Sequence, residues 1–171
     1  MNIADAWKGQ KQWSDYFLPE IKQILSEHLT KIVRIDIAPF SEDVERNTDL
    51  IVLRLDGVRV ACRIRKFVYF EQYGGEFTIR NKTASGNKTE LDKIREGWGD
   101  YLFYGWANQA ETKLHGWTLG SIDVLRTYMD ECFANGICPW ASQRYNWYDG
   151  TGFVAFRYKD VPDNYLVAYS N

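Results

Sequence analysis

The chain has 171 residues, of which 45% are hydrophobic and 16% aromatic, and its formal net charge is −2. This length fits one domain with a sizeable core. Because the net charge is slightly negative, the protein as a whole does not attract nucleic acid, and any such binding requires a local basic patch. The three cysteines lack CxxC spacing, which argues against a disulfide framework and against a structural zinc site.

The first half of the chain predicts a helix followed by strands. Apolar side chains recur at helical spacing over residues 15–29, and residues 32–37 alternate between apolar and charged side chains, as in a half-buried strand. Two β-rich runs, 49–55 and 58–65, are separated by Asp56-Gly57, a dipeptide typical of a tight hairpin turn. We therefore predict a helix, a strand and then a hairpin.

The second half continues the mixture of strands and helices. We predict a third strand of the same sheet at 76–81, later strands at 101–106, 117–122, 153–157 and 165–169, and helices at 89–98 and 122–133. Segment 134–150 has the composition of a loop, and the last two strands close the fold on either side of a turn at Pro162-Asp163. The predicted fold is a single mixed α/β domain, 1–171, with a central mixed sheet flanked by helices.

A basic face follows from the alternation of side chains in the second strand of the hairpin. Arg59, Arg63 and Arg65 share one face of that strand, because successive side chains point to opposite sides. Candidate nucleic-acid-binding residues are therefore these three arginines together with Lys66, Arg80, Lys82 and Lys88. The alternative is the solvated outer face of an edge strand, where positive charge prevents aggregation.

The hairpin also has the layout of a metal-dependent nuclease motif, with an acid at the start of one strand and charged residues alternating along the next. In this respect the chain resembles the PD-(D/E)xK nuclease superfamily over residues 15–106. The resemblance implies a restriction-endonuclease-like core, about 15–125, with a β-rich closing segment, about 134–171. It implies that Asp49 is a metal ligand, that Mg²⁺ is the cofactor of an enzyme, and that the activity is cleavage of DNA.

The second part of the motif departs from the superfamily, because Arg63-Ile64-Arg65 stands where Glu-x-Lys is expected. An arginine cannot ligate a metal. Either Glu90 supplies the missing carboxylate, with Lys93 on the same helical face as a further catalytic residue, or cleavage is lost and the arginines bind phosphates or an acidic partner. Two structural alternatives stay open: Asp49 pairs with an arginine across the hairpin, and Glu90 is an acid favoured in the first turn of a helix.

Longer stretches, including TDLIVLRLDGVRVACRIRK and GWGDYLFYGWAN, resemble a family of phage and prophage proteins that brings no established activity. The resemblance implies a phage or mobile-element setting, and hence the cytoplasm of an infected or lysogenic bacterial host. DNA is the partner that the nuclease-like motif and the arginine face lead us to expect. The N-terminal sequence lacks an apolar signal core, and no stretch approaches the ~20 apolar residues of a membrane span, so we expect a soluble protein without a membrane partner.

An alternative function is that of a phage accessory module that binds or inhibits a host protein. Such a module would use the arginine face or a late group of aromatic residues, Trp140, Tyr145, Trp147 and Tyr148. Exposed aromatic side chains are typical of partner surfaces. The competing interpretation is that these aromatic residues pin their own loop onto the body of the protein.

Overall fold

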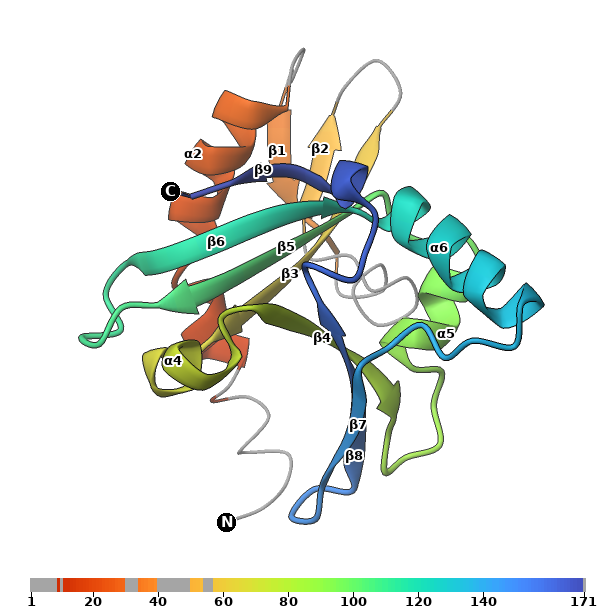
Figure 1. Cartoon of the computed structure of the whole chain (residues 1–171). Helices are drawn as coiled ribbons and strands as arrows, with labels where there is room; N and C mark the ends of the chain where they lie inside the picture. The colour runs from red at the N-terminus through yellow and green to blue at the C-terminus, as the bar shows by residue number, and fades with distance from the viewer. Residues whose placement is uncertain (1–8, 10, 30–33, 40–49, 54–56, 171) are drawn as a thin grey trace.

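The structure, a computed structural model, describes residues 9, 11–29, 34–39, 50–53 and 57–170. Within these residues the chain forms a larger and a smaller sheet with helices on both sides of the larger one (Figure 1). The larger sheet has the order β1 (Arg34–Ile37), β2 (Leu50–Leu53), β3 (Val58–Arg65), β5 (Tyr101–Ala107), β6 (Leu114–Ser121) and β9 (Leu166–Tyr169). The smaller sheet has the order β4 (Glu76–Lys82), β8 (Thr151–Arg157) and β7 (Ser142–Asn146).

The larger sheet is mixed, which confirms the predicted fold class. Strands β1, β2 and β3 are antiparallel to one another, β5 runs parallel to β3, and β6 and β9 are again antiparallel. A parallel pair requires a crossover connection, and that connection contains α5 (Glu90–Arg95) and the strand β4. The predicted hairpin is confirmed as β2–β3, and Gly57 at its turn has φ +57°, which glycine adopts readily.

Helix α2 (Leu18–His28) covers one face of the larger sheet. Proline lies in its first turn, where the missing N–H costs no helical hydrogen bond, so the helix forms within the predicted range 15–29. Its apolar stripe is buried against side chains of β2, β3, β5 and β6. The members of this core are Phe17, Leu18, Ile21 and Leu25 from the helical region and Leu50, Val60, Ile64, Phe103 and Leu119 from the sheet.

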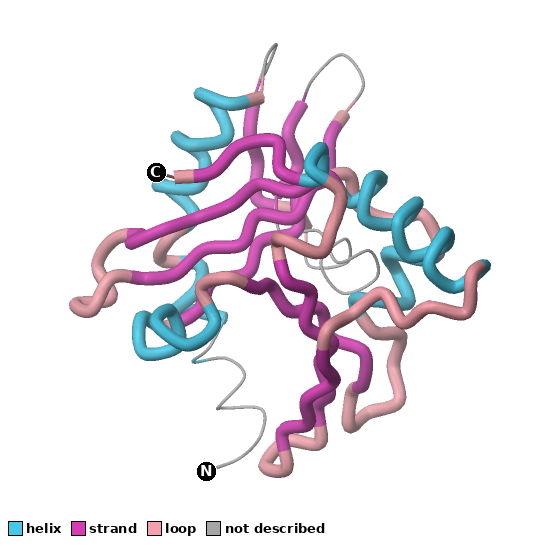
Figure 2. Tube along the Cα trace, in the orientation of Figure 1, coloured by secondary structure: helices cyan, strands magenta, loops and turns pink. Residues whose placement is uncertain are grey.

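The opposite face of the larger sheet is covered by α5, α6 (Ile122–Ala134) and the smaller sheet (Figure 2). Phe77 and Ile79 of β4 and Val154 and Phe156 of β8 bury the inner face of the smaller sheet in this second core. The face of β3 that carries the arginines therefore looks toward the second core and the smaller sheet. Because β3 lies between β2 and β5, the alternative of a solvated edge strand is wrong.

Helix α5 begins at a capping box, which makes its start sensitive to one side chain. The Thr89 hydroxyl accepts a hydrogen bond from the Asp92 N–H at 3.2 Å, and the Asp92 carboxylate accepts one from the Thr89 N–H at 2.9 Å. Thr89→Ala is expected to lower the free energy of unfolding by about 1 kcal/mol at neutral pH, as measured by urea denaturation. Thr83→Ala, in the preceding loop, should change it by less than about 0.5 kcal/mol.

The contribution of this capping box to the free energy of unfolding depends on pH in a direction that can be predicted. Hydrogen bonds from the Thr89 N–H and, to a smaller extent, from the Thr89 hydroxyl at 2.8 Å lower the pKa of the Asp92 carboxyl below its usual value, and Thr89→Ala removes the contribution of the hydroxyl. A lowered folded-state pKa contributes stability above the pKa of the unfolded chain, and this contribution is lost as the pH falls through the folded-state pKa. The difference between wild type and Thr89→Ala should therefore shrink in acid, and an unchanged difference would contradict the assignment.

The structure differs from the predicted strands in three places. The strand predicted at 76–81 exists as β4, but it belongs to the smaller sheet, because the chain leaves β3 through the short helices η1 (Phe67–Tyr69) and α4 (Phe70–Tyr73). Segment 134–150, predicted as a loop, contains β7. The last two strands do not pair with each other: the turn η2 (Asp163–Tyr165) carries the chain from β8 in one sheet to β9 in the other.

Candidate functional site

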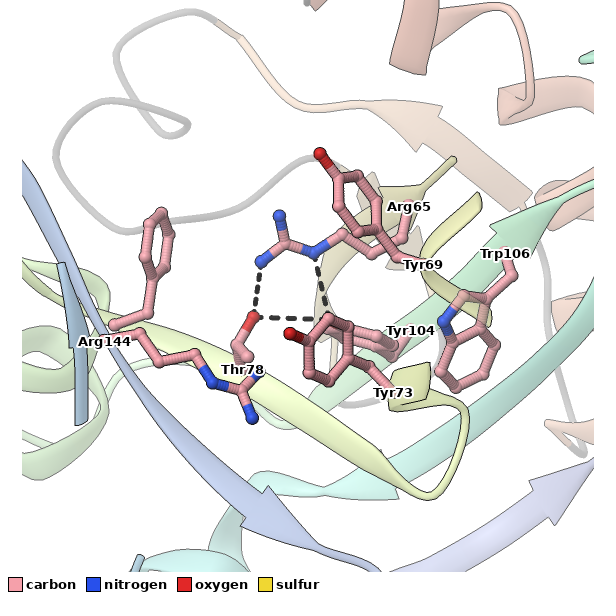
Figure 3. Close-up of a pocket in the computed structure, with 8 residues that line it drawn as sticks. Arg65, Tyr69, Tyr73, Thr78, Tyr104, Trp106 and Arg144 are labelled. Atoms are coloured by element: carbon pink, nitrogen blue, oxygen red, sulfur yellow. Dashed lines mark hydrogen bonds between the residues drawn. The ribbon is translucent and has the colours of Figure 1, made fainter. Parts of the chain in front are cut away.

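A cavity of about 230 Å³ lies where the smaller sheet meets the arginine-bearing face of the larger one (Figure 3). Its walls combine cationic and aromatic side chains from several elements. The lining residues are Arg65, Tyr69, Tyr73, Thr78, Tyr104, Trp106, Arg144 and Phe153. Six of these eight residues carry an aromatic ring or a hydroxyl, and the other two are arginines, so the wall suits an anion attached to a flat group.

The strand registers explain why arginines gather here. In the smaller sheet Arg80 of β4 and Arg144 of β7 both lie directly opposite Phe153 of β8, so the three side chains share one face. In the larger sheet Arg63 pairs with Tyr104 and Arg65 with Trp106 across the parallel β3–β5 ladder. Two rows of basic and aromatic side chains thus face one another.

The ring of Phe153 is the point at which these rows meet. The guanidinium carbons of Arg63, Arg65 and Arg80 lie 5.7, 5.5 and 5.9 Å from its centroid, within the range of a cation–π interaction. Burial lowers the pKa of Arg63, and the charges of Arg65 and Arg80 lower it further, against the opposing effect of Glu90. The site therefore concentrates positive charge in a place with limited access to water.

Two carboxylates compensate part of this charge. Glu90, only 7% exposed, accepts a hydrogen bond from the Arg63 guanidinium and another from the Arg80 backbone N–H at 3.0 Å. Glu76 of β4 accepts one from Arg144, whose guanidinium also lies 4.4 Å from the centroid of the Tyr73 ring. Arg63 and Arg144 are thus each held by a carboxylate.

Arg65 and Arg80 are less completely compensated. Arg65 donates to the hydroxyl groups of Tyr104, at 3.0 Å, and Thr78, and these two hydroxyl groups lie 3.2 Å apart (Figure 3). Among the described residues Arg65 has no carboxylate partner. The buried Nε of Arg80 finds no acceptor among them either. Of these two arginines Arg65 lines the cavity, and it therefore offers guanidinium charge to an anionic ligand.

Three of the seven predicted nucleic-acid-binding residues, Arg63, Arg65 and Arg80, meet at the Phe153 ring, and of these Arg65 alone lines the cavity. Lys82 lies 4.9 Å from the ring centroid of Tyr145, and neither of these two residues lines the cavity. The other three do not line the cavity. Their contacts are as follows: Lys66 pairs with Glu111 at 3.2 Å, Lys88 pairs with Glu96 at 2.7 Å, and the Arg59 N–H donates to the Asp100 carboxylate at 2.7 Å.

The predicted metal site is only partly covered by the described residues. Asp49 lies outside them, so its role as a metal ligand stays a prediction. Glu90 and Lys93 are both buried on α5, and one Glu90 carboxylate oxygen, Oε2, accepts hydrogen bonds from a guanidinium and an amide. No group of three or more His, Cys, Asp or Glu side chains suited to a metal occurs among the described residues, and the donors present fit a buried salt bridge better than a Mg²⁺ site.

Sequence reasoning missed several residues of the site, among them Phe153, Arg144, Tyr69 and Tyr73. For the first two a signal was present. Asp149-Gly150 is the same kind of turn dipeptide as the one that predicted the first hairpin, and it lies between β7 and β8. The two tyrosines come from η1 and α4, a short helical segment that has no clear pattern in the sequence.

Within the part of the chain that the structure describes, no helix is long and apolar enough to cross a membrane.

Comparison with known proteins adds no further constraint on this site. A scan against models of known protein families finds no match, and a search of curated proteins finds no significant similarity.

Proposed function

We propose that the protein binds nucleic acid without cutting it, and that one phosphate of the strand enters the cavity beside Arg65 and Arg144. The observation that carries this proposal is the guanidinium charge of Arg65, which lines the cavity beside aromatic rings and has no carboxylate partner among the described residues. Guanidinium groups bind phosphate through paired, charge-assisted hydrogen bonds. The chain as a whole is weakly acidic, so a local basic cavity is what phosphate binding requires.

The order of elements supports a nuclease-like frame. Helix α2, the antiparallel strands β1–β2–β3, the crossover containing α5 and the parallel strand β5 follow one another in the order that the PD-(D/E)xK resemblance implies. Arg63 and Arg65 stand on β3, where that superfamily has its Glu-x-Lys motif. Since Glu90 is engaged by Arg63 and the Arg80 N–H, we infer a phage-type derivative that keeps phosphate binding and lacks cleavage.

The test is a binding titration with a labelled single-stranded oligonucleotide, followed by fluorescence anisotropy at several salt concentrations. Binding should weaken linearly on a log–log plot as salt rises, because phosphate contacts release counterions. Arg65→Ala should weaken binding by about 10-fold or more, since a charge-assisted hydrogen bond is lost. Lys88→Ala removes an exposed cation that pairs with Glu96 outside the cavity, and should change affinity by less than about twofold.

Several outcomes would contradict the proposal. An equal loss in both variants would place binding elsewhere, and no binding by the wild-type protein at low salt would favour an acidic protein as partner of the same arginines. Cleavage of plasmid DNA with Mg²⁺, abolished in Glu90→Gln, would instead support a metal-dependent deoxyribonuclease. Thermal unfolding of Arg65→Ala checks that its cavity still forms.

A further inference from the structure

The hairpin formed by β7 and β8 ends in two aromatic side chains that the rest of the protein does not cover. Trp147 is 86% exposed and Tyr148 is 99% exposed. The four late aromatic residues therefore have different environments. Trp140 packs edge-on against Phe156 of the second core, as in a pinned loop, whereas the tip of the hairpin points into solvent beyond the smaller sheet (Figure 1).

Hydrogen bonds fix the backbone of the turn at the tip of this hairpin. The Gly150 N–H donates to the Asn146 carbonyl at 3.0 Å, and the Tyr148 N–H donates to the Asn146 side chain at 3.2 Å. The Asp149 carboxylate accepts from the Thr151 N–H at 3.0 Å and from its hydroxyl at 2.6 Å. These contacts fix the backbone on both sides of the two rings, so the rings are presented to solvent by a defined turn.

The tip lies close to the cavity along the chain and has a cation of its own. Trp147 directly follows β7 and is three residues beyond Arg144 of the cavity, a step of roughly 10 Å for an extended chain. The Trp147 ring packs edge-on against Tyr145 with 4.8 Å between centroids, and Lys82 lies 4.9 Å from the Tyr145 centroid. Tyr145 and Lys82 both pair with Gly152, so they lie on the opposite face of the smaller sheet from Arg144 and Phe153. A strand held in the cavity therefore reaches the tip by passing over the edge strand β7.

This arrangement suits a polyanion whose flat groups are accessible. Large exposed rings are typical of interaction sites, and stacking of bases on aromatic side chains beside a basic groove is the common mode of binding to single strands. Bases within a duplex are already stacked and paired, so they cannot lie on Trp147 and Tyr148 without opening of the helix. The chemistry of the tip therefore selects unpaired bases.

We infer that the tip is a second contact, on which unpaired bases stack next to the phosphate held in the cavity. The ligand is then a single strand rather than a duplex. This inference rests on the proposed function and deepens it, because it names the form of nucleic acid that the site binds. Stacking tolerates any base, so little sequence preference is expected.

The test compares an oligothymidylate of about 2 nucleotides, shorter than the roughly 4–16 nucleotides of known single-strand sites, with one of about 12 nucleotides, which lies within that range. The short ligand reaches the cavity alone, and the long one reaches the tip as well. The double variant Trp147→Ala/Tyr148→Ala should bind the short ligand as wild type does, and should bind the long one between about 5-fold and about 150-fold more weakly. Trp147→Phe/Tyr148→Phe should restore most of that loss.

Tyr169→Ala is the matched control, because it removes a ring that is 59% exposed on β9 in the other sheet; affinity for both ligands should stay unchanged. If the double variant binds both lengths as wild type does, the tip has no part in binding while the proposed function stands. If wild type binds neither length, the proposed function fails. Tighter binding of a duplex than of a single strand of equal length would overturn the choice of ligand.

Discussion

Glu90→Ala is expected to lower the free energy of unfolding by about 3–5 kcal/mol, because it leaves the guanidinium of Arg63 buried without its carboxylate. The two side chains are 7% and 15% exposed, so water cannot replace the lost partner. The Arg80 N–H loses an acceptor in the same variant. Urea denaturation, read by tryptophan fluorescence, measures the change.

A matched control is the exposed pair of Lys88 and Glu96, whose side chains are 66% and 42% exposed. Glu96→Ala should cost no more than about 1 kcal/mol. Similar costs for the two variants would show that the Glu90 pair is not buried in solution. Replacing both Arg63 and Glu90 by leucine should cost less than Glu90→Ala alone, because no unpaired charge remains.

Gly120→Ala is expected to lower the free energy of unfolding by about 3 kcal/mol, at the upper end of the usual cost of overpacking a core. A Cβ at this position of β6 would lie 2.2 Å from Cζ and 2.4 Å from the hydroxyl oxygen of Tyr165. The Tyr165 ring is 1% exposed and packs against Phe77 with 4.9 Å between centroids. It therefore has no free space into which to move.

Gly116→Ala in the same strand isolates this steric effect. The nearest atoms to a Cβ there lie 3.6 Å away, an ordinary contact distance, so any change reflects the strand rather than a clash. We expect a loss of less than about 1 kcal/mol. Because burial raises the pKa of the Tyr165 hydroxyl well above its usual value, a displaced ring should titrate at lower pH in Gly120→Ala than in wild type, which ultraviolet absorbance detects.

The sequence predicted local structure well and the pairing of distant strands poorly. Strand β3 lies at the predicted residues 58–65, since a turn dipeptide and strict alternation fix both its ends. Strand β4 was also found, but alternation at 76–81 shows only that one face is buried and not which strand lies alongside. Its partner β8 is about 70 residues away in the chain, and no local pattern specifies that contact.

The candidate site was likewise predicted well within one strand and poorly between distant strands. Alternation places Arg63 and Arg65 on one face of β3, and the structure agrees. Alternation does not predict that Phe153 and Arg144 lie near these two arginines, because Phe153 and Arg144 belong to a hairpin more than 75 residues later in the chain. The partner of Arg63 was open in the sequence, and the structure identifies Glu90 as a described carboxylate that fills this role.

The two sheets are interleaved along the chain, since β4 comes from its middle, β7 and β8 come near its end, and β9 then returns to the larger sheet. No single cut therefore separates one sheet from the other. Removing everything after α6 would strip β4 of its only hydrogen-bonded neighbour among the described strands and would also take away the strand beside β6. The smaller sheet is thus not a portable module, and the cavity requires both the middle of the chain, which supplies Arg65 to Trp106, and its later hairpin, which supplies Arg144 and Phe153.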